Sequence, residues 1–192
     1  LKEKEIITDP KSIDAYIKDD IKNSLALATD NKGKINDSLR LKFYKVTDAC
    51  YSRNDYNPIW SDTAHWKPYT DSMMAYFDKA ILDGLFKEHY QYKKIKAIRD
   101  MLDNDSAKRK DAILWTKADI LLTDAFMHMV ADLAQGRLQP DSLSWRNDTS
   151  KYNKYFFAAF DKFRNKDTIT GIFQQLQPTH KGYLALKAGI PH

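Results

Sequence analysis

The longest helical pattern in the chain runs from Ile113 to Leu133, where apolar residues recur at the spacing of one helix face. That periodicity is typical of an amphipathic α-helix with a buried side. Gly136 stands where a left-handed residue commonly ends a helix, and Pro140 lies just beyond it, where it prevents the helix from resuming. The sequence therefore predicts one long helix with a defined end, which we expect to form the centre of the fold.

The rest of the chain predicts further helices joined by short loops. Three apolar ladders precede the long helix: Ile13, Ile17, Ile21 and Leu25; Leu39, Phe43, Val46 and Cys50; and Met73, Phe77, Ala80 and Ile81. A charged, peripheral helix is expected over 90–102. Helices are also expected over 152–163, 169–176 and 181–188, and the first of these would bury Tyr155, Phe156, Ala159, Phe160 and Phe163.

Strand signals are scarce. The chain has only six glycines and almost no alternating β-branched segments, so the hairpins that a sheet requires are missing. Pro58 to Trp60 is the one place where a brief strand is expected. The predicted fold is all-α, a single compact domain over 1–192 with short loops.

Charge and hydropathy narrow the possible partners. The 31 basic residues are interspersed with 26 acidic ones, giving a formal net charge of +5 without a basic face, so nucleic acid is not an expected partner. No apolar run approaches the ~20 residues that span a bilayer, so no transmembrane segment is expected. The chain begins at Leu1 without a leader, and we expect that a targeting segment was removed or that this is part of a longer protein.

The residues that could carry chemistry do not form a known constellation. Cys50, the only cysteine, falls on an apolar stripe near the C-terminal end of a predicted helix, where the dipole opposes a thiolate. The five histidines show no metal-binding spacing, and His128 is interpreted as a packed residue. Asp119 and Asp124 stand five apart, so they are expected on different sides of the long helix. No catalytic residue, metal or cofactor is predicted.

Recognition by surface aromatics is the remaining possibility. Tyr56, Trp66 and Tyr69 lie in an irregular polar segment, and aromatic rings in loops can stack on sugars or cover a partner. We predict a binding role for these three residues and a core role for Trp60, which follows an apolar run. The competing account of Trp66 is that it packs over the start of the next helix.

Several phrases follow one another in an order that resembles a known family. They are Tyr51 to Trp60, Ala80 to Leu85 with Asp83 and Gly84, His89-Tyr90, Leu121 to Pro140 with Asp124, Gly136 and Arg137, Trp145, and Leu176 to Lys187. Together they resemble the scaffold domain that precedes the catalytic domain of large bacterial L,D-transpeptidases, which cross-link peptidoglycan. The resemblance covers roughly 39–190, and residues 1–38 lie outside it as an N-terminal helical region.

The resemblance implies a non-catalytic helical domain in the periplasm or cell envelope. Its implied partners are the C-terminal transpeptidase domain of the same parent chain and, in addition, peptidoglycan. The serine-x-glycine-cysteine signature of the catalytic domain is absent from this chain. Two alternatives stay open: a free-standing helical module that binds a cell-wall polymer or envelope protein, and an enzyme of a kind that the sequence does not reveal.

Overall fold

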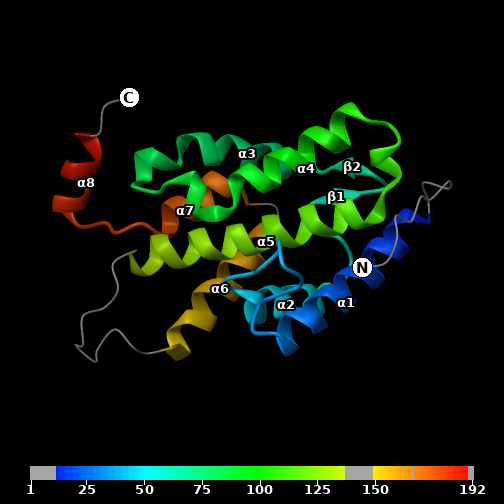
Figure 1. Cartoon of the computed structure of the whole chain (residues 1–192). Helices are drawn as coiled ribbons and strands as arrows, with labels where there is room; N and C mark the ends of the chain where they lie inside the picture. The colour runs from blue at the N-terminus through cyan, green and yellow to red at the C-terminus, as the bar shows by residue number, and fades with distance from the viewer. Residues whose placement is uncertain (1–11, 137–148, 166, 190–192) are drawn as a thin grey trace.

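The computed structural model describes residues 12–136, 149–165 and 167–189, without the side chains of 149–153. Eight α-helices occupy these residues (Figure 1): α1 (Ile13–Asp30), α2 (Tyr44–Arg53), α3 (Pro68–Lys79), α4 (Tyr92–Asn104), α5 (Ala112–Gln135), α6 (Thr149–Arg164), α7 (Ile169–Leu176) and α8 (Lys181–Ala188). Three short 3₁₀ turns accompany them: Ala80–Asp83, Lys87–Tyr90 and Lys108–Lys110. The prediction of a single compact all-α domain is confirmed.

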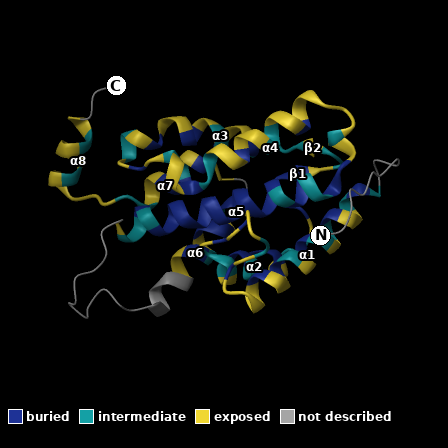
Figure 2. Cartoon of the chain, viewed as in Figure 1, coloured by how far each residue is buried: buried dark blue, intermediate teal, exposed yellow. Residues whose placement is uncertain are grey.

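Helix α5 is the centre of the fold. Its residues are buried on nearly every side over most of its length (Figure 2). Helices α1, α2 and α6 pack on one side of it, and α4 and α7 pack on the other, where α3 lies against α7 (Figure 1). A helix surrounded in this way is apolar over most of its circumference, which explains why its pattern dominates the sequence.

Both ends of α5 have a local physical cause. At its start, the Asp111 side chain accepts hydrogen bonds from the amides of Ile113 and Leu114, at 3.0 and 3.4 Å. At its end, Gly136 has φ of 80° and ψ of 161°. This conformation differs from the left-handed helical one that we expected, because ψ is extended, and it is available essentially to glycine alone. Gly84, after the 3₁₀ turn that follows α3, does adopt the left-handed conformation, with φ of 73° and ψ of 17°.

The second predicted helix begins later than its apolar stripe indicates. Leu39 is buried, but it precedes α2, which starts at Tyr44. The backbone before α2 forms an isolated antiparallel bridge between Lys34 and Arg40, and this turn brings Leu39 to the core without a helix. The spacing of apolar residues therefore predicted correctly that Leu39 is buried, but it placed the start of the helix too early.

Two residues predicted to lie in the core are exposed instead. Ile81 is 47% exposed, because the chain tightens from α3 into a 3₁₀ turn at Ala80 and the changed helical repeat turns this side chain outward. Tyr155 is 41% exposed on α6. The buried stripe of that helix consists of Phe156, Ala159, Phe160 and Phe163, so Tyr155 falls at the edge of the stripe.

The expected brief strand lies slightly further along the chain. Strands β1 (Ser61–Asp62) and β2 (His65–Trp66) form an antiparallel hairpin, in which Ser61 faces Trp66. Thr63 and Ala64 at its tip both have positive φ, as a tight two-residue turn requires. The residues for which a strand was predicted, Pro58 to Trp60, come directly before this hairpin, so the prediction placed the strand a few residues too early.

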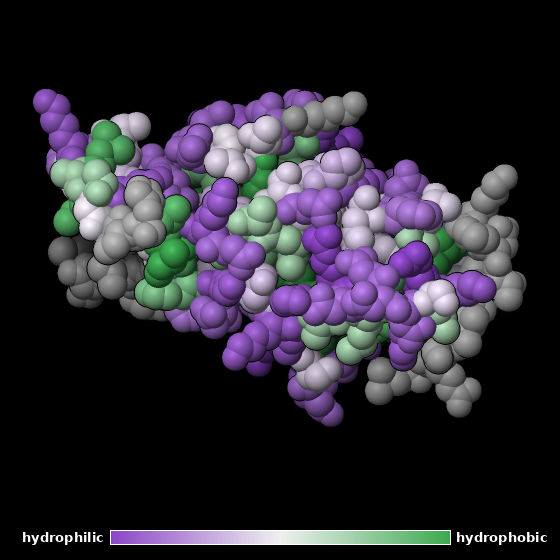
Figure 3. Space-filling model, turned by 90° about the horizontal axis from the view of Figure 1, so that it is seen from above, coloured by the Kyte–Doolittle hydropathy of each residue, from purple (hydrophilic) through white to green (hydrophobic). Residues whose placement is uncertain are grey.

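The face of the molecule drawn in Figure 3 is mainly hydrophilic. Figure 3 shows one face of the molecule on which hydrophobic side chains are scattered among hydrophilic ones. Among the helices that the structure describes, none combines the length and the apolar character needed to cross a membrane. Helix α8 buries no residue and is held at one end by an ion pair between Lys187 and Asp83, at 2.5 Å.

Candidate functional site

Asp119, in the first half of α5, is a fully buried carboxylate with four hydrogen-bond donors around it. The backbone amides of Ile59 and Trp60 donate to it at 2.8 and 3.0 Å, and the hydroxyl groups of Tyr51 and Ser61 at 2.6 and 3.2 Å. Burial raises the pKa of this carboxyl above its usual value, although the hydrogen bonds act in the opposite direction. The group thus joins α2 and the loop before β1 to the central helix.

One turn further along α5, Thr123 extends this network. Its hydroxyl oxygen accepts a hydrogen bond from the Trp60 indole nitrogen at 2.8 Å and lies 3.0 Å from the Tyr51 hydroxyl. The Trp60 ring packs against the rings of Phe126 and Phe163. Trp60 is therefore a core residue whose one polar atom is satisfied by α5.

The Asp124 side chain accepts backbone hydrogen bonds in a similar way, at the start of α2. Its carboxylate accepts hydrogen bonds from the backbone amides of Lys42 and Phe43, at 3.1 and 2.7 Å. Helix α2 has no side-chain cap of its own at this end, so a residue more than eighty positions away satisfies these amides. Burial raises the pKa of Asp124 to about 6, and the two amide hydrogen bonds counteract part of that rise.

A third polar cluster lies around His128 on the same helix. Its Nε2 atom lies 2.6 Å from Lys42 Nζ and 3.4 Å from the Asp132 carboxylate, which also accepts a hydrogen bond from the Tyr90 hydroxyl at 2.8 Å. The rings of Tyr90 and Phe43 pack on the imidazole. His128 is thus a packed residue with polar neighbours.

Cys50 is unsuited to nucleophilic chemistry. The thiol is fully buried on α2, and burial raises its pKa to about 12. Because a thiolate is the reactive form, this cysteine is almost entirely protonated at neutral pH. Within the described ranges, no three histidine, cysteine or acidic side chains gather in a way that could hold a metal ion.

The three residues predicted to bind a ligand lie in different surroundings. The Trp66 ring packs against Trp115, and its indole nitrogen donates to Asp103 at 2.8 Å. The Tyr69 hydroxyl donates to the Ile59 carbonyl, and its ring packs against Trp60 and Phe163. Tyr56 is partly buried beside Asp48, to which its hydroxyl donates at 3.3 Å.

No aromatic contact joins any two of these three rings in the described part of the chain. They therefore do not form one aromatic platform. Each ring is partly buried and packs against the core, and the predicted binding role of these residues stays a prediction.

Some of the residues for which a structural role was predicted lie in the described part of the chain, and others lie outside it. Asp83 accepts a hydrogen bond from the Tyr76 hydroxyl and pairs with Lys187, so it links α3 to α8. Arg137, Pro140 and Trp145 lie outside the residues that the structure describes.

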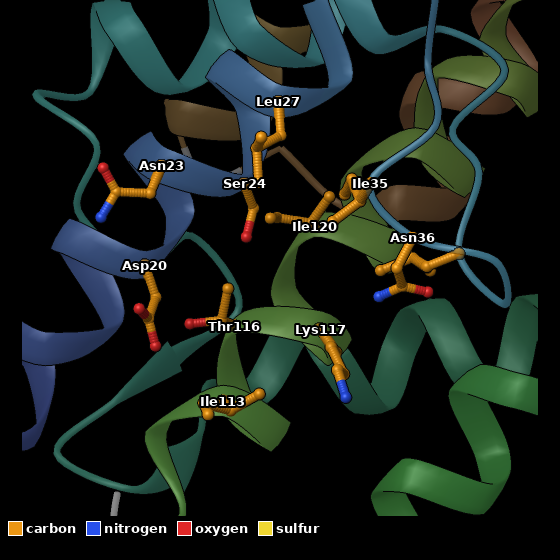
Figure 4. A pocket seen from close by; sticks show the side chains of 11 residues that line it. Asp20, Asn23, Ser24, Leu27, Ile35, Asn36, Ile113, Thr116, Lys117 and Ile120 are labelled. Carbon is orange, nitrogen blue, oxygen red and sulfur yellow. The ribbon is translucent and has the colours of Figure 1, made fainter. Parts of the chain in front are cut away.

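A groove of about 460 Å³ opens between α1, α5 and the segment that connects α1 to α2 (Figure 4). Its apolar lining consists of Leu27, Ile35, Leu39, Ile113 and Ile120, and its polar lining of Asp20, Asn23, Ser24, Asn36, Thr116 and Lys117. This volume falls in the range of ligand pockets. The sequence analysis did not predict the groove, because its walls come from segments almost 100 positions apart. The signal that could have pointed to it is the presence of two polar residues, Thr116 and Lys117, on the largely buried helix α5.

These features define an all-helical domain in which the buried carboxylates of Asp119 and Asp124 accept hydrogen bonds from backbone amides of distant segments. Residues 45–189 match the model of a family described as Scaffold domain. The match spans more than half of the chain, and the chain therefore belongs to the Scaffold domain family. Comparison with curated proteins gives no match, and comparison with solved structures gives none either.

Proposed function

We propose that this chain is the non-catalytic scaffold domain of an L,D-transpeptidase, an enzyme that cross-links bacterial peptidoglycan through a cysteine nucleophile. The observation that carries the proposal is the order of the phrases that resemble this family, from Tyr51 to Lys187, all of which lie inside the matched segment 45–189. The proposal implies a location in the periplasm or cell envelope and a transpeptidase domain in the same parent chain.

The physical character of the fold supports a scaffolding role. Asp119 and Asp124 connect α5 to backbone atoms 60 and 81 positions away, at Ile59 and Phe43. Buried hydrogen bonds between distant segments favour one rigid arrangement over others, because each alternative leaves polar groups unpaired. A domain built in this way can hold a neighbouring domain at a fixed position without taking part in its chemistry.

The first test is to read the parent open reading frame beyond His192. The proposal predicts a serine-x-glycine-cysteine motif there. A reading frame that encodes no such motif would contradict it and favour a free-standing helical module that binds a cell-wall polymer or envelope protein. The groove beside α1 is the observation that supports this second possibility.

The second test uses the complete parent protein. Asp119→Ala should destabilise the scaffold and lower the thermal unfolding midpoint of the attached transpeptidase domain, while leaving its cysteine chemistry intact. Asp100→Ala, which removes an exposed carboxylate from α4, is the matched control. If the transpeptidase domain unfolds at the same temperature in both variants, the two domains are independent and the scaffolding role is wrong.

A further inference from the structure

A smaller pocket, of about 250 Å³, opens where α2 and α6 end beside the start of α3. Its apolar wall consists of Pro58, Ile59, Phe160 and Phe163, and its polar wall of Asn54, Lys67, Tyr69 and Arg164. Tyr69 is one of the three residues for which a binding role was predicted. Among the described residues that line this pocket, two are cations and none is acidic.

The two cations of the pocket keep hydrogen-bonding capacity for a ligand. The Lys67 ammonium group donates to the carbonyl oxygens of Pro58 and Ile59, at 3.0 and 3.1 Å, which fixes its position and leaves the third of its three N–H groups. Arg164 is exposed and forms no ion pair or hydrogen bond with the described part of the chain. A lysine and an arginine that line one pocket favour a ligand with an anionic group.

The negative charges around the pocket limit the charge of that group. Helices α2 and α6 both end here, and each helix C-terminus carries about −0.5 elementary charge, so the two together offset roughly one of the two positive charges. The remaining charge of about +1 matches a carboxylate better than a phosphate monoester, which carries about −1.5 to −2.

Three carboxylates lie near the pocket without lining it, and each has a partner of its own. Asp161, one turn before the end of α6, lies 4.0 Å from the Arg53 guanidinium group. Asp62 accepts a hydrogen bond from the neighbouring Thr63 hydroxyl at 2.8 Å. Asp119 is buried behind Ile59, whose amide donates to it at 2.8 Å. These carboxylates therefore do not occupy the position of a bound anion.

The neutral polar groups of the pocket suit the hydroxyl groups of a ligand. The Asn54 amide nitrogen donates to the Asn57 carbonyl at 2.9 Å, and its side-chain oxygen stays available as an acceptor. The Tyr69 hydroxyl donates to the Ile59 carbonyl, so its oxygen can accept a further hydrogen bond. A simple aliphatic acid would cover both oxygens without pairing them, at a cost, whereas the hydroxyl groups of a sugar can donate to them.

We propose that this pocket binds a sugar that carries one carboxylate group. Arg164 and Lys67 bind the carboxylate, the side-chain oxygens of Asn54 and Tyr69 accept hydrogen bonds from sugar hydroxyl groups, and one face of the ring packs against the apolar wall. The volume of about 250 Å³ suits a single ring. The acidic sugar can be a uronic acid or the N-acetylmuramic acid of a cell wall. This inference goes beyond the scaffold function and does not depend on it.

An NMR titration of the complete chain tests the proposal. The Ile59 methyl group and the backbone amides of Asn54 and Lys67 report on the pocket, whereas the methyl group of Ile95, buried in α4, is an internal reference. The labelled chain is titrated at constant pH and ionic strength, because the attraction between exposed charges depends on salt. The five compounds are glucuronate, N-acetylmuramate, glucose, glucose 6-phosphate and acetate.

We expect glucuronate, N-acetylmuramate or both to shift the three pocket signals and to leave Ile95 unchanged. Whichever binds more tightly identifies the source of the acidic sugar. Glucose should bind about tenfold or more weakly, because it cannot form the charge-assisted hydrogen bonds. Acetate should also bind at least about tenfold more weakly, because it lacks the hydroxyl groups and the ring. These comparisons use the wild-type chain and do not depend on the folding of any variant.

Two variants with the same change in net charge test the role assigned to Arg164. Arg164→Gln should weaken binding of the acidic sugar about tenfold and leave binding of glucose unchanged. Lys154→Gln removes a charge from an exposed position on the same helix, about 15 Å away along its axis, and should bind like wild type.

Other results would overturn the proposal. Absence of shifts with both acidic sugars would show that the pocket is not a site for them. Equal binding of glucose and glucuronate would show that the cations do not select the ligand, and equal binding of acetate would identify a site for simple anions. Tighter binding of glucose 6-phosphate would identify a sugar-phosphate site instead. An equal loss of affinity in both variants would show a general surface-charge effect. None of these results bears on the scaffold function, which is tested by the parent reading frame and the transpeptidase domain.

Discussion

Replacing Asp119 with alanine should destabilise this protein strongly. The change leaves the buried amides of Ile59 and Trp60 without the acceptor that they have at 2.8 and 3.0 Å. The Ser61 hydroxyl loses its acceptor as well, while the Tyr51 hydroxyl keeps Thr123 as a partner. Each buried donor left unpaired costs about 1–3 kcal/mol, so the two amides together cost roughly 2–6 kcal/mol. Loss of the buried charge removes part of its desolvation penalty, and we therefore expect a net loss of about 3 kcal/mol.

Urea unfolding followed by tryptophan fluorescence measures this loss, because Trp60 lies within the network that Asp119 organises. A loss of about 3 kcal/mol would be a large share of the roughly 5–15 kcal/mol that stabilises a typical domain. Asp100→Ala is the matched control, because its solvent-exposed ion pair with Lys96 should contribute little to stability. If Asp119→Ala is as stable as this control, the carboxylate does not hold the loop to α5 and the reasoning is wrong.

Three further predictions concern single residues. Because the folded-state pKa of Asp124 is raised from 3.8 to about 6, its protonation stabilises the fold fully below about pH 4, and this contribution is lost as the pH rises through 6. Urea unfolding at several pH values should therefore show wild type losing about 3 kcal/mol relative to Asp124→Asn across this window, and parallel pH profiles would contradict the assignment. Cys50 should react with a thiol reagent only slowly in the native protein and rapidly in urea, since its thiol is buried with a pKa of about 12; immediate stoichiometric labelling of the native state would show that it is accessible. Gly136→Val should cost about 1–3 kcal/mol in urea unfolding, because a β-branched residue is strained at φ of 80° and ψ of 161° although the space around it is open, and an unchanged midpoint would show that the backbone there readily adjusts.

Much of the helical architecture could be predicted because helix formation leaves a local signature. The ladder from Ile13 to Leu25 is buried in α1, and the predicted helices 169–176 and 181–188 match α7 and α8 at both ends. The long apolar pattern from Ile113 to Leu133 lies within α5. In each case the residues that specify the helix lie within one or two turns of one another, so their spacing alone carries the information.

Prediction was less accurate where a backbone change alters the helical repeat. Ile81 satisfies the spacing of α3, but the chain has already tightened into a 3₁₀ turn there, and the side chain faces outward. Leu39 continues the apolar spacing of α2 and is buried, but it lies before the first residue of that helix. Periodicity reports which residues are apolar at regular intervals, and it does not report where the hydrogen-bond pattern of the backbone changes.

By itself, the sequence determined that this protein is helical, that α5 is its centre and that Cys50 and Trp60 belong to the core, because apolar periodicity and burial follow from near neighbours. Only the tertiary structure decided what the polar residues do. Asp119 and Asp124 were recognisable as acidic residues on a buried helix, but their partners at Ile59 and Phe43 lie 60 and 81 positions away. The groove that contains Lys117 likewise exists only where α1 and α5 meet. A hydrogen bond or a cavity wall between distant segments leaves no periodic trace in the chain, and its energy depends on a geometry that forms only when those segments pack together.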